Sequence, residues 1–382
     1  MSKGSRNNIS VVIDDAIPFI RGIIEPFASV LYLPGREITR ERIMNADALI
    51  IRTRTTCDEK LLEGTRVSFI ASATIGYDHI DTGYCRRRGI SWRTAPGCNS
   101  GSVQQYMTAA LLHLCDRLSM EPGHLTVGIV GAGNVGSKIA SAAGALGFKV
   151  LVNDPPRQRR EKKGGFVSLD HLVSHSDIVT LHVPLSLKGR DATFHLAGSR
   201  FIEKMKRGAF LINTSRGGVT GEEEVKRALL TGQLGGYIAD VWSGEPAADR
   251  ELISMSLIAT PHIAGYSADG KLNATAMAIR SFSEFFQVSP AIPHTGLLPV
   301  PSDPSPDYSG LKASATKVIK RYVSHTYDII ADSERFKANP DYFEQLRNNY
   351  PPRREFGAFS VGSGLPYNDI LMKLGVRERQ QP

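Results

Sequence analysis

The sequence predicts an α/β fold in which parallel sheets are covered by helices. Three observations support this class. Short apolar runs alternate with helical patterns along most of the chain, a glycine-rich turn joins one run to a helix, and polar residues follow the ends of the runs. Strands that are buried on both faces are continuously apolar, and parallel neighbours need a helical crossover between them. In such open sheets, ligands bind beyond the carboxyl ends of the strands, where these polar residues stand.

Composition and charge limit the kind of protein. The 382 residues are enough for two or three domains, and a hydrophobic content of 41% supports real cores. The net charge of +8 favours anionic ligands such as phosphates and carboxylates, and it is also compatible with nucleic acid or with a solvated basic surface. The four cysteines lack zinc-like spacing, so we expect reduced thiols and no metal site.

We expect a cytoplasmic protein that makes no contact with a membrane. The first residues lack the apolar core of a signal peptide. No stretch approaches the roughly 20 apolar residues that a membrane helix needs.

The order of predicted elements is that of repeated strand–helix units. In the first hundred residues we expect strands in 10–15, 29–35, 48–53 and 67–74, with helices in 16–27 and 38–45. A helix over 101–118 leads to a strand in 126–130, a glycine turn, a helix and a second strand that ends at Asp154. Further strands are expected in 177–185, 209–215, 235–242 and 256–266, followed by a helix over 274–287. Six prolines in 288–307 are typical of a semi-extended linker. The tail after it predicts helices in 311–330, 340–350 and 367–375 and a strand in 356–361.

The glycine-rich turn indicates a dinucleotide site. Gly131, Gly133 and Gly136 have the G-x-G-x-x-G spacing, and the motif follows a strand and opens a helix. The first glycine permits the tight turn, the second lets the backbone approach a pyrophosphate, and the third lets helix and strand pack closely. Asp154, at the end of the next strand, suits the ribose hydroxyls and repels a 2′-phosphate, which favours NAD over NADP. Arg157 weakens this preference, because an arginine can receive that phosphate.

Three residues after strand ends have the chemistry of a hydride transfer from a 2-hydroxy acid. His262 suits the base that takes the hydroxyl proton, since imidazole titrates near neutral pH. Arg216 suits the substrate carboxylate, because its planar fork grips a carboxylate in two places. Glu245 suits the group that orients the imidazole and stabilises its protonated form. Each residue alone is compatible with a structural role; their joint occurrence beside a cofactor motif favours catalysis.

Four motifs, in order, resemble the D-isomer-specific 2-hydroxyacid dehydrogenase family: "VGIVGAGNVG", "INTSRGGV", "DVWSGEP" and "TPHIAGY". The resemblance covers about residues 9–288. It implies a Rossmann-type parallel-sheet NAD domain over 99–264 and a flavodoxin-like α/β substrate domain over 1–98 and 265–288. It also implies that Arg216, Glu245 and His262 are the substrate-binding arginine, the assisting acid and the acid/base histidine. The implied cofactor-binding residues are Gly131, Gly133, Asn134, Val135, Gly136, Asp154, Val183, Thr214, Ser215, Asp240 and Gly265.

Further stretches resemble one subfamily of these dehydrogenases. "IRTRT", "ASATIGYDHID", "APGCNS" and "VNDPPR" are similar to the members that oxidise 4-phospho-D-erythronate to (R)-3-hydroxy-2-oxo-4-phosphobutanoate in pyridoxal 5′-phosphate biosynthesis. The resemblance implies that Thr53, Thr74 and Tyr266 contact the substrate. It also implies a linker over 289–306 and a small α+β domain over 307–382 through which two copies form a homodimer. We add the hypothesis that Arg52 or Arg54 helps to hold the substrate phosphate.

Other functions stay open at this point. The chain could oxidise another D-2-hydroxy acid, such as phosphoglycerate, or it could be an NAD-sensing binding protein without catalysis. The basic tail carries no nucleic-acid-binding motif, and its charges are mixed with acids and apolar helix faces, so we expect no nucleic acid partner.

Overall fold

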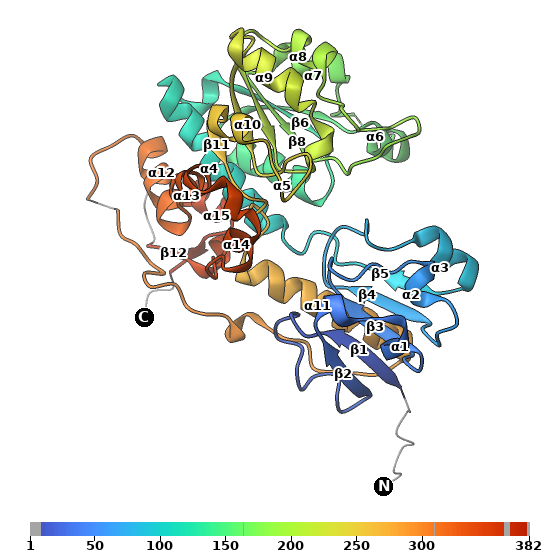
Figure 1. The fold of residues 1–382 in the computed structure, drawn as a ribbon. Helices are drawn as coiled ribbons and strands as arrows, with labels where there is room; N and C mark the ends of the chain where they lie inside the picture. The colour runs from blue at the N-terminus through green and yellow to red at the C-terminus, as the bar shows by residue number, and fades with distance from the viewer. Residues whose placement is uncertain (1–8, 163, 309, 363–366, 380–382) are drawn as a thin grey trace. The chain divides into compact units, whose positions relative to one another are not determined.

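A computed structural model describes residues 9–162, 164–308, 310–362 and 367–379 (Figure 1). Residues 1–8, where we expect no signal peptide, lie outside the described part. The chain forms two compact units. Unit 1 holds the residues up to Asn99 together with Ser267–Pro299, and unit 2 holds Ser100–Tyr266 together with the residues from Val300 onward. The finer division into a cofactor domain, a linker and a dimerisation domain stays a prediction.

Unit 1 is built on a five-stranded parallel sheet in the order β2-β1-β3-β4-β5. This is the flavodoxin-like strand order, as predicted. Its elements are β1 (Ser10–Asp14), β2 (Ser29–Leu33), α1 (Arg40–Ile43), β3 (Ala48–Ile51), α2 (Glu59–Leu62), β4 (Phe69–Ser72), α3 (Thr82–Arg88), β5 (Ser91–Arg93) and α11 (Ala268–Phe286). One face of the sheet packs on α11 through Ala278, Ile279 and Phe282, and the other packs on the short helices α1 to α3.

The predicted helix over residues 16–27 is wrong, since this segment forms a series of turns. Pro18 and Pro26 each lack the backbone N–H that a helix interior needs. Phe19 and Gly22 have positive φ angles of 61° and 81°, which a right-handed helix does not allow. The apolar residues that suggested a helix, Ile17, Ile20 and Ile24, are nevertheless buried in the sheet's core.

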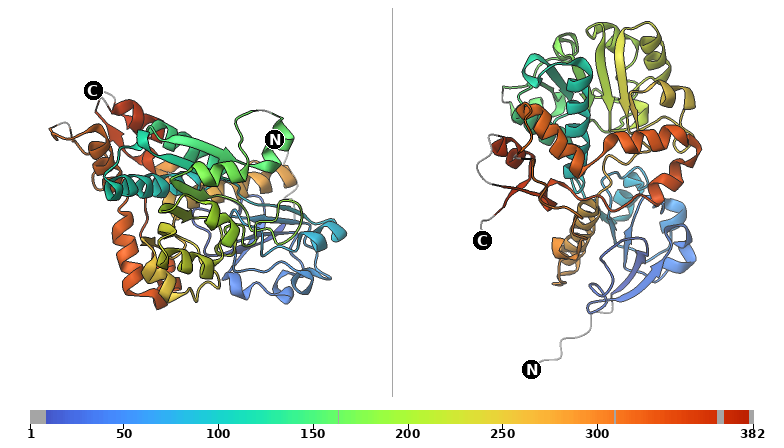
Figure 2. Two further views of the ribbon diagram at one scale, coloured as in Figure 1. Left: turned by 90° about the horizontal axis from the view of Figure 1, so that it is seen from above. Right: turned by 90° about the vertical axis from the view of Figure 1, so that its left-hand side faces the viewer.

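Unit 2 is built on a six-stranded parallel sheet in the order β11-β10-β9-β8-β6-β7. From β6 the chain passes outward to β7 and then returns to β8 on the other side of β6. The carboxyl ends of β6 and β8 therefore form a topological switch point, where open α/β sheets bind ligands. Figure 2 shows the elements of this unit, in teal, green and yellow, from two further sides. The elements of this part are α4 (Ser100–Leu118), β6 (Thr126–Val130), α5 (Asn134–Ala145), β7 (Lys149–Asn153), α6 (Pro155–Glu161), α7 (Leu169–His175), β8 (Ile178–Leu181), α8 (Ser199–Lys204), β9 (Ala209–Asn213), α9 (Glu222–Leu230), β10 (Leu234–Ala239), α10 (Arg250–Met255) and β11 (Ile258–Ala259).

The C-terminal tail shares the core of unit 2. Its elements are α12 (Ala315–Thr326), α13 (Ile329–Ala338), α14 (Phe343–Asn348), β12 (Ser360–Val361), α15 (Asn368–Leu374) and β13 (Arg377–Glu378). Residues Val318, Ile319 and Tyr322 of α12 are buried in the same cluster as α4 and α5. Phe336 and Phe343 join the cluster on the other face, which also contains Trp242. The tail therefore packs against the elements that follow the ends of β10 and β11.

Within the described residues, no helix is long and apolar enough to cross a membrane.

Candidate active site

The glycine turn lies between β6 and α5 and is shaped by its backbone. Gly131 has a φ of +91°, and a Cβ atom there would lie 2.5 Å from the carbonyl oxygen of His182. A Cβ atom on Gly136 would lie 1.9 Å from the carbonyl oxygen of Gly131. Only glycine is therefore tolerated at these two positions. Gly133, in contrast, has no heavy atom within 4 Å of its Cβ position, so the face of the turn that a pyrophosphate approaches is uncovered.

Asp154 ties the end of β7 to the glycine turn. Its carboxylate accepts hydrogen bonds from the backbone N–H of Ala132 and of Arg157, both at 2.8 Å. The Arg157 guanidinium donates to the Ala132 carbonyl at 2.7 Å and pairs with Glu161 at 2.6 Å. Arg157 is thus already engaged by an acid and by the turn itself, whereas Asp154 places a negative charge beside the turn. This arrangement favours ribose hydroxyls over a 2′-phosphate.

The residues that follow β8 lie against the glycine turn. The carbonyl of His182 and the side chain of Val183 lie 2.5 and 2.8 Å from the Cβ position of Gly131. The His182 ring is held between the hydroxyls of Thr180, at 2.8 Å, and Thr214, at 3.4 Å. Burial lowers the pKa of His182 to about 3, so its imidazole is neutral. His182 links the ends of β8 and β9 and carries no charge for catalysis.

A buried asparagine shapes the loop that carries Arg216. Asn213, the last residue of β9, accepts hydrogen bonds from the N–H and hydroxyl of Ser215 and donates to the carbonyl of Arg216 at 2.9 Å. The next residue, Gly217, packs its Cα against the backbone of Trp242, and a Cβ atom there would lie 2.0 Å from the Trp242 carbonyl carbon. The Arg216 loop therefore contacts the start of the loop that carries Glu245. Sequence reasoning missed Asn213, whose only signal is an amide at the end of an apolar strand.

Glu245 and His262 form the central pair of the site. The Nδ1 atom of His262 lies 2.7 Å from Oε2 of Glu245. The other oxygen, Oε1, accepts the backbone N–H of Trp242 at 2.9 Å. Burial raises the pKa of the Glu245 carboxyl, but the hydrogen bond and charge of His262 and the Trp242 N–H outweigh burial, so that its pKa is lowered overall. Glu245 is therefore ionised at neutral pH and orients the imidazole through one nitrogen.

Asp240 fixes the turn on which His262 stands. Its buried carboxylate accepts the hydroxyl of Thr260 at 2.7 Å and the backbone N–H groups of Ile263 and Ala264 at 2.7 and 2.9 Å. Its own carbonyl accepts the N–H of His262 at 2.7 Å. These bonds hold His262 at a φ of +58°, a left-handed conformation that side chains seldom adopt. Burial raises the pKa of Asp240 to about 6, although the nearby His262 lowers it. Sequence reasoning treated Asp240 as a cofactor contact and missed this positioning role.

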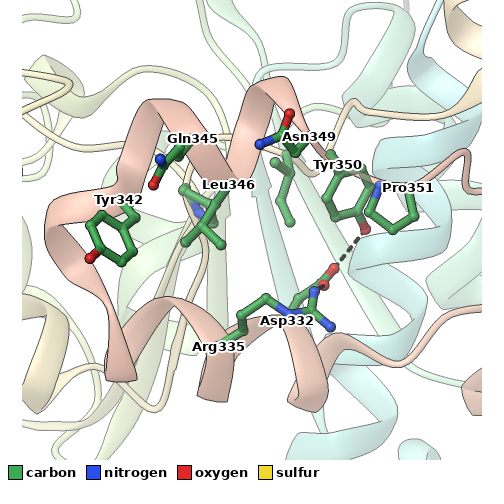
Figure 3. Close-up of a pocket in the computed structure, with 10 residues that line it drawn as sticks. Asp332, Arg335, Tyr342, Gln345, Leu346, Asn349, Tyr350 and Pro351 are labelled. Atoms are coloured by element: carbon green, nitrogen blue, oxygen red, sulfur yellow. Dashed lines mark hydrogen bonds and ion pairs between the residues drawn. The ribbon is translucent and has the colours of Figure 1, made fainter.

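The C-terminal tail supports the far side of the same turn. The Arg353 guanidinium is buried and donates to the carbonyl of Ala264 at 2.6 Å. The ring of Tyr350 meets the ring of Tyr266 edge to face, with centroids 6.2 Å apart. A pocket of about 420 Å³ lies behind the turn, and Figure 3 shows α14 on one side of it and α13 on the other. Its lining residues are Pro261, Ile263, Asp332, Arg335, Tyr342, Gln345, Leu346, Asn349, Tyr350 and Pro351.

The predicted substrate residues of unit 1 follow the ends of β3 and β4. Thr53 is exposed, and Arg52 donates to the carbonyl of Ala16 at 3.2 Å. The Thr74 hydroxyl lies 2.7 Å from the hydroxyl of Ser72, which also meets the ring of His79 at 3.0 Å. Unit 1 thus offers polar groups at one edge of its sheet, as expected from the sequence.

No group of three or more metal-ligating side chains gathers anywhere in the described ranges. An uncovered glycine turn at a switch point, with a paired histidine and carboxylate on the same sheet, fits the binding of a dinucleotide.

Comparisons with known proteins agree with this class. Residues 104–264 match the family model described as "D-isomer specific 2-hydroxyacid dehydrogenase, NAD binding domain". Residues 297–375 match a model described only as a domain of unknown function. Among solved structures, a D-lactate dehydrogenase from Aquifex aeolicus, complexed with NAD and lactic acid, is 25% identical and has a TM-score of 0.59. That match covers 72% of this chain and 95% of the other. The chain therefore has the fold and the NAD-binding domain of the NAD-dependent 2-hydroxyacid dehydrogenases.

Two curated relatives show to which group of these dehydrogenases the chain belongs. An erythronate-4-phosphate dehydrogenase from Bacteroides fragilis is 47% identical over 354 residues, which cover 92% of this chain and 99% of the relative. Another from Escherichia fergusonii is 36% identical over 378 residues, covering 98% of this chain and all of the relative (100%). The chain belongs to the erythronate-4-phosphate dehydrogenases, among the D-isomer-specific 2-hydroxyacid dehydrogenases.

Proposed function

We propose that the chain oxidises 4-phospho-D-erythronate to (R)-3-hydroxy-2-oxo-4-phosphobutanoate, with NAD as hydride acceptor, in the synthesis of pyridoxal 5′-phosphate. The observation that carries this proposal is the 2.7 Å contact between His262 and Glu245 on the sheet that also bears the glycine turn. The names of the relatives supply the substrate. A net charge of +8 agrees with a substrate that carries both a carboxylate and a phosphate.

His262 is the proposed base. Because Glu245 accepts from Nδ1–H, the Nε2 atom is left with the lone pair that takes the proton of the 2-hydroxyl group. As the proton moves, the ionised Glu245 stabilises the imidazolium that forms. Bound NAD would supply the acceptor for the hydride that leaves C2. The hydroxyl proton stays on Nε2, and the C–O bond becomes the carbonyl of the product.

Arg216 is the proposed partner of the substrate carboxylate. Its loop is fixed by Asn213 and packed on the Trp242 backbone, and its guanidinium donates to the carbonyl of Ser215 at 2.8 Å. A planar guanidinium binds a carboxylate through two parallel hydrogen bonds. It thereby holds C2 in one orientation and also favours the polarised carbonyl of the product.

The remaining predicted residues keep their roles in the proposal. Thr53, Thr74, Tyr266 and Arg52 bind the substrate. The glycine turn, Asp154 and Val183 bind the cofactor, together with the other members of the set: Asn134, Val135, Thr214, Ser215, Asp240 and Gly265. The uncovered face of Gly133 and the acid at the end of β7 support NAD as that cofactor.

We also propose that the chain works as a cytoplasmic homodimer that joins through its C-terminal tail. All four cysteines are free in the structure, which agrees with a reducing compartment. The tail exposes large apolar side chains, among them Leu311 at 46% and Tyr342 at 55%, of the kind that a subunit interface covers. Light scattering of the purified chain tests the dimer, and a monomeric mass at micromolar concentration would remove it.

The test of the reaction is NADH formation from defined acids. We expect turnover with 4-phospho-D-erythronate and a much lower kcat/KM with 3-phospho-D-glycerate. A 2-oxo acid acceptor belongs in a parallel assay, so that bound cofactor can be reoxidised if it does not leave between turnovers. Faster oxidation of phosphoglycerate would assign the chain to another substrate. Tight NAD binding without turnover of any 2-hydroxy acid would make it a binding protein.

A further inference from the structure

One arginine of the C-terminal tail, Arg347, lies beside Tyr266, close to the turn that carries His262. Arg347 stands on α14, and its guanidinium carbon lies 5.4 Å from the ring centroid of Tyr266 and 5.6 Å from that of Phe343. Its Nε atom is buried and makes no hydrogen bond in the structure. Among the ion pairs formed by the described residues, none includes Arg347. Nε is enclosed by the protein, whereas the terminal NH2 groups of the guanidinium donate to none of the described residues and are the donors that a ligand beside Tyr266 can use.

The position of Arg347 is fixed by a chain of aromatic contacts. Trp242, whose N–H binds Glu245, meets Phe336 with ring centroids 6.0 Å apart, and Phe336 meets Phe343 at 5.7 Å. The Arg347 guanidinium in turn packs against the ring of Phe343. The tail therefore holds the Arg347 guanidinium at a fixed position relative to the loop that carries Glu245.

The electrostatic environment of Glu245 supports the same placement. Burial is the largest influence and raises the pKa of this carboxyl; His262, the Trp242 N–H and the Arg347 charge lower it. Arg347 therefore lies within electrostatic reach of the proposed proton-transfer pair. The other arginines nearby are engaged elsewhere. Arg335 pairs with Asp332, and Arg353 donates to backbone carbonyls.

We propose that Arg347 binds the phosphate group of the substrate, through the donors that it presents beside Tyr266. The proposal rests on the proposed function, in which Arg216 binds the carboxylate of the substrate. A substrate with an anionic group at each end needs cations for both groups, and a guanidinium suits the oxygens of a phosphate. Arg347 would bind the phosphate in addition to Arg52 or Arg54, for which we expect a smaller contribution. In this arrangement the tail completes the substrate site, and the enzyme selects a phosphorylated 2-hydroxy acid over an unphosphorylated one.

The experiment compares two acids that differ only in the phosphate. Arg347→Met keeps an aliphatic stem of similar length on Tyr266 and Phe343 and removes the charge. We expect its kcat/KM for 4-phospho-D-erythronate to fall about 10- to 100-fold, mainly through KM, as expected for lost hydrogen bonds to a charged group. The kcat/KM for D-erythronate should change by less than about threefold, since that acid has no phosphate to lose.

Two variants control for folding and charge. Arg347→Lys restores the charge without the planar fork and should recover part of the loss. Arg321→Met removes a charge from an exposed position on α12 and should leave both acids unaffected. Equal losses for both acids in Arg347→Met, or no loss for either, would overturn the proposal and leave Arg347 as a packing residue.

A binding measurement separates this proposal from the proposed function. If the unmodified enzyme does not oxidise 4-phospho-D-erythronate, the proposed function fails, and the proposal for Arg347 is then decided by inorganic phosphate. Calorimetry of the NAD-loaded protein should show phosphate binding that Arg347→Met weakens at least about tenfold. Equal affinity of the two proteins for phosphate, or no binding by either, would overturn the proposal. The same titration decides the case if D-erythronate reacts too slowly to measure.

Discussion

The sheet edges of the two units differ in how firmly their functional side chains are held. In unit 2, Glu245 and His262 bind each other, and Asp240 fixes the histidine's turn through four hydrogen bonds. In unit 1, the Thr74 hydroxyl lies 2.7 Å from that of Ser72, but Thr53 is exposed and Arg52 is held by a hydrogen bond of 3.2 Å to the carbonyl of Ala16. Proton transfer requires a base within hydrogen-bond reach in one orientation, whereas a charged ligand can draw flexible side chains to itself. The difference agrees with the proposal that unit 2 carries out the proton transfer and that unit 1 contributes to substrate binding.

The largest expected effect comes from removing the base. His262→Asn should lower kcat about 10²- to 10⁴-fold, the usual worth of general acid–base catalysis, with little change in the KM for NAD. Asparagine is chosen because it tolerates the left-handed conformation observed at this position better than alanine does. Steady-state NADH formation measures the effect.

An unchanged melting temperature must accompany the loss in His262→Asn, so that the effect is assigned to the imidazole and not to the turn. Turnover within about tenfold of the unmodified enzyme would show that another group moves the proton, since a lost general base normally costs far more than that. The contrast between the two edges would then lose its functional meaning.

A second, smaller effect tests whether the turn must be rigid. In Asp240→Asn, the new amide would oppose one of the donors now bound by the carboxylate, at Thr260, Ile263 or Ala264. We expect a loss of about 1–3 kcal/mol in the free energy of unfolding and roughly a tenfold fall in kcat. Urea unfolding and initial rates measure both.

The pH dependence of the free energy of unfolding tests whether the Asp240 carboxyl is responsible for the difference in stability between the two proteins. Its folded pKa of about 6 lies above the ordinary value of 3.8. The carboxyl therefore contributes stability that is present below about pH 4 and lost as pH rises through 6. The Asn variant lacks this contribution, so the stability gap between the two proteins should narrow by on the order of 1 kcal/mol between pH 5 and pH 7.5. A gap that widens with pH would contradict the assignment.

The sequence predicted best those features whose physical cause is local. The glycine turn could be found because three glycines, a strand and a helix lie within a few residues of one another, and the structure shows why Gly131 and Gly136 must be glycine. The parallel sheets followed from continuous apolar runs. The predicted helix over 16–27 failed because its apolar spacing is also satisfied by turns, which the two prolines and Gly22 impose.

Features that depend on distant contacts could not be predicted. Arg353 binds the carbonyl of Ala264 across 89 positions of sequence, and nothing in the tail's composition indicates that partner. Arg347 likewise appears in the sequence as one basic residue among several. The double role of Asp240, which closes the His262 turn with its side chain, becomes visible only when β10 and β11 are neighbours.

Removing Asp154 should change the selection of NAD over NADP moderately, because this selection depends on one acid beside the glycine turn. Asp154→Ala removes the acceptor of the Ala132 and Arg157 N–H groups and the negative charge that repels a 2′-phosphate. We expect the KM for NAD to rise about tenfold and the ratio of kcat/KM for NADP to that for NAD to rise with it. Arg227→Ala, an exposed arginine on α9, serves as the control. An unchanged NADP to NAD ratio would place the discrimination elsewhere.

The smallest effect is expected at the loosely held edge of unit 1. Arg52→Ala should raise the KM for 4-phospho-D-erythronate by roughly three- to tenfold and leave kcat nearly unchanged, since an adjustable surface cation adds binding energy equally in the ground and transition states. Arg66, an exposed arginine that pairs with Asp47 in the same unit, gives the matched control as Arg66→Ala. If Arg52→Ala instead lowered kcat as strongly as His262→Asn does, unit 1 would take part in the chemical step. The distinction between an edge for chemistry and an edge for binding would then fail.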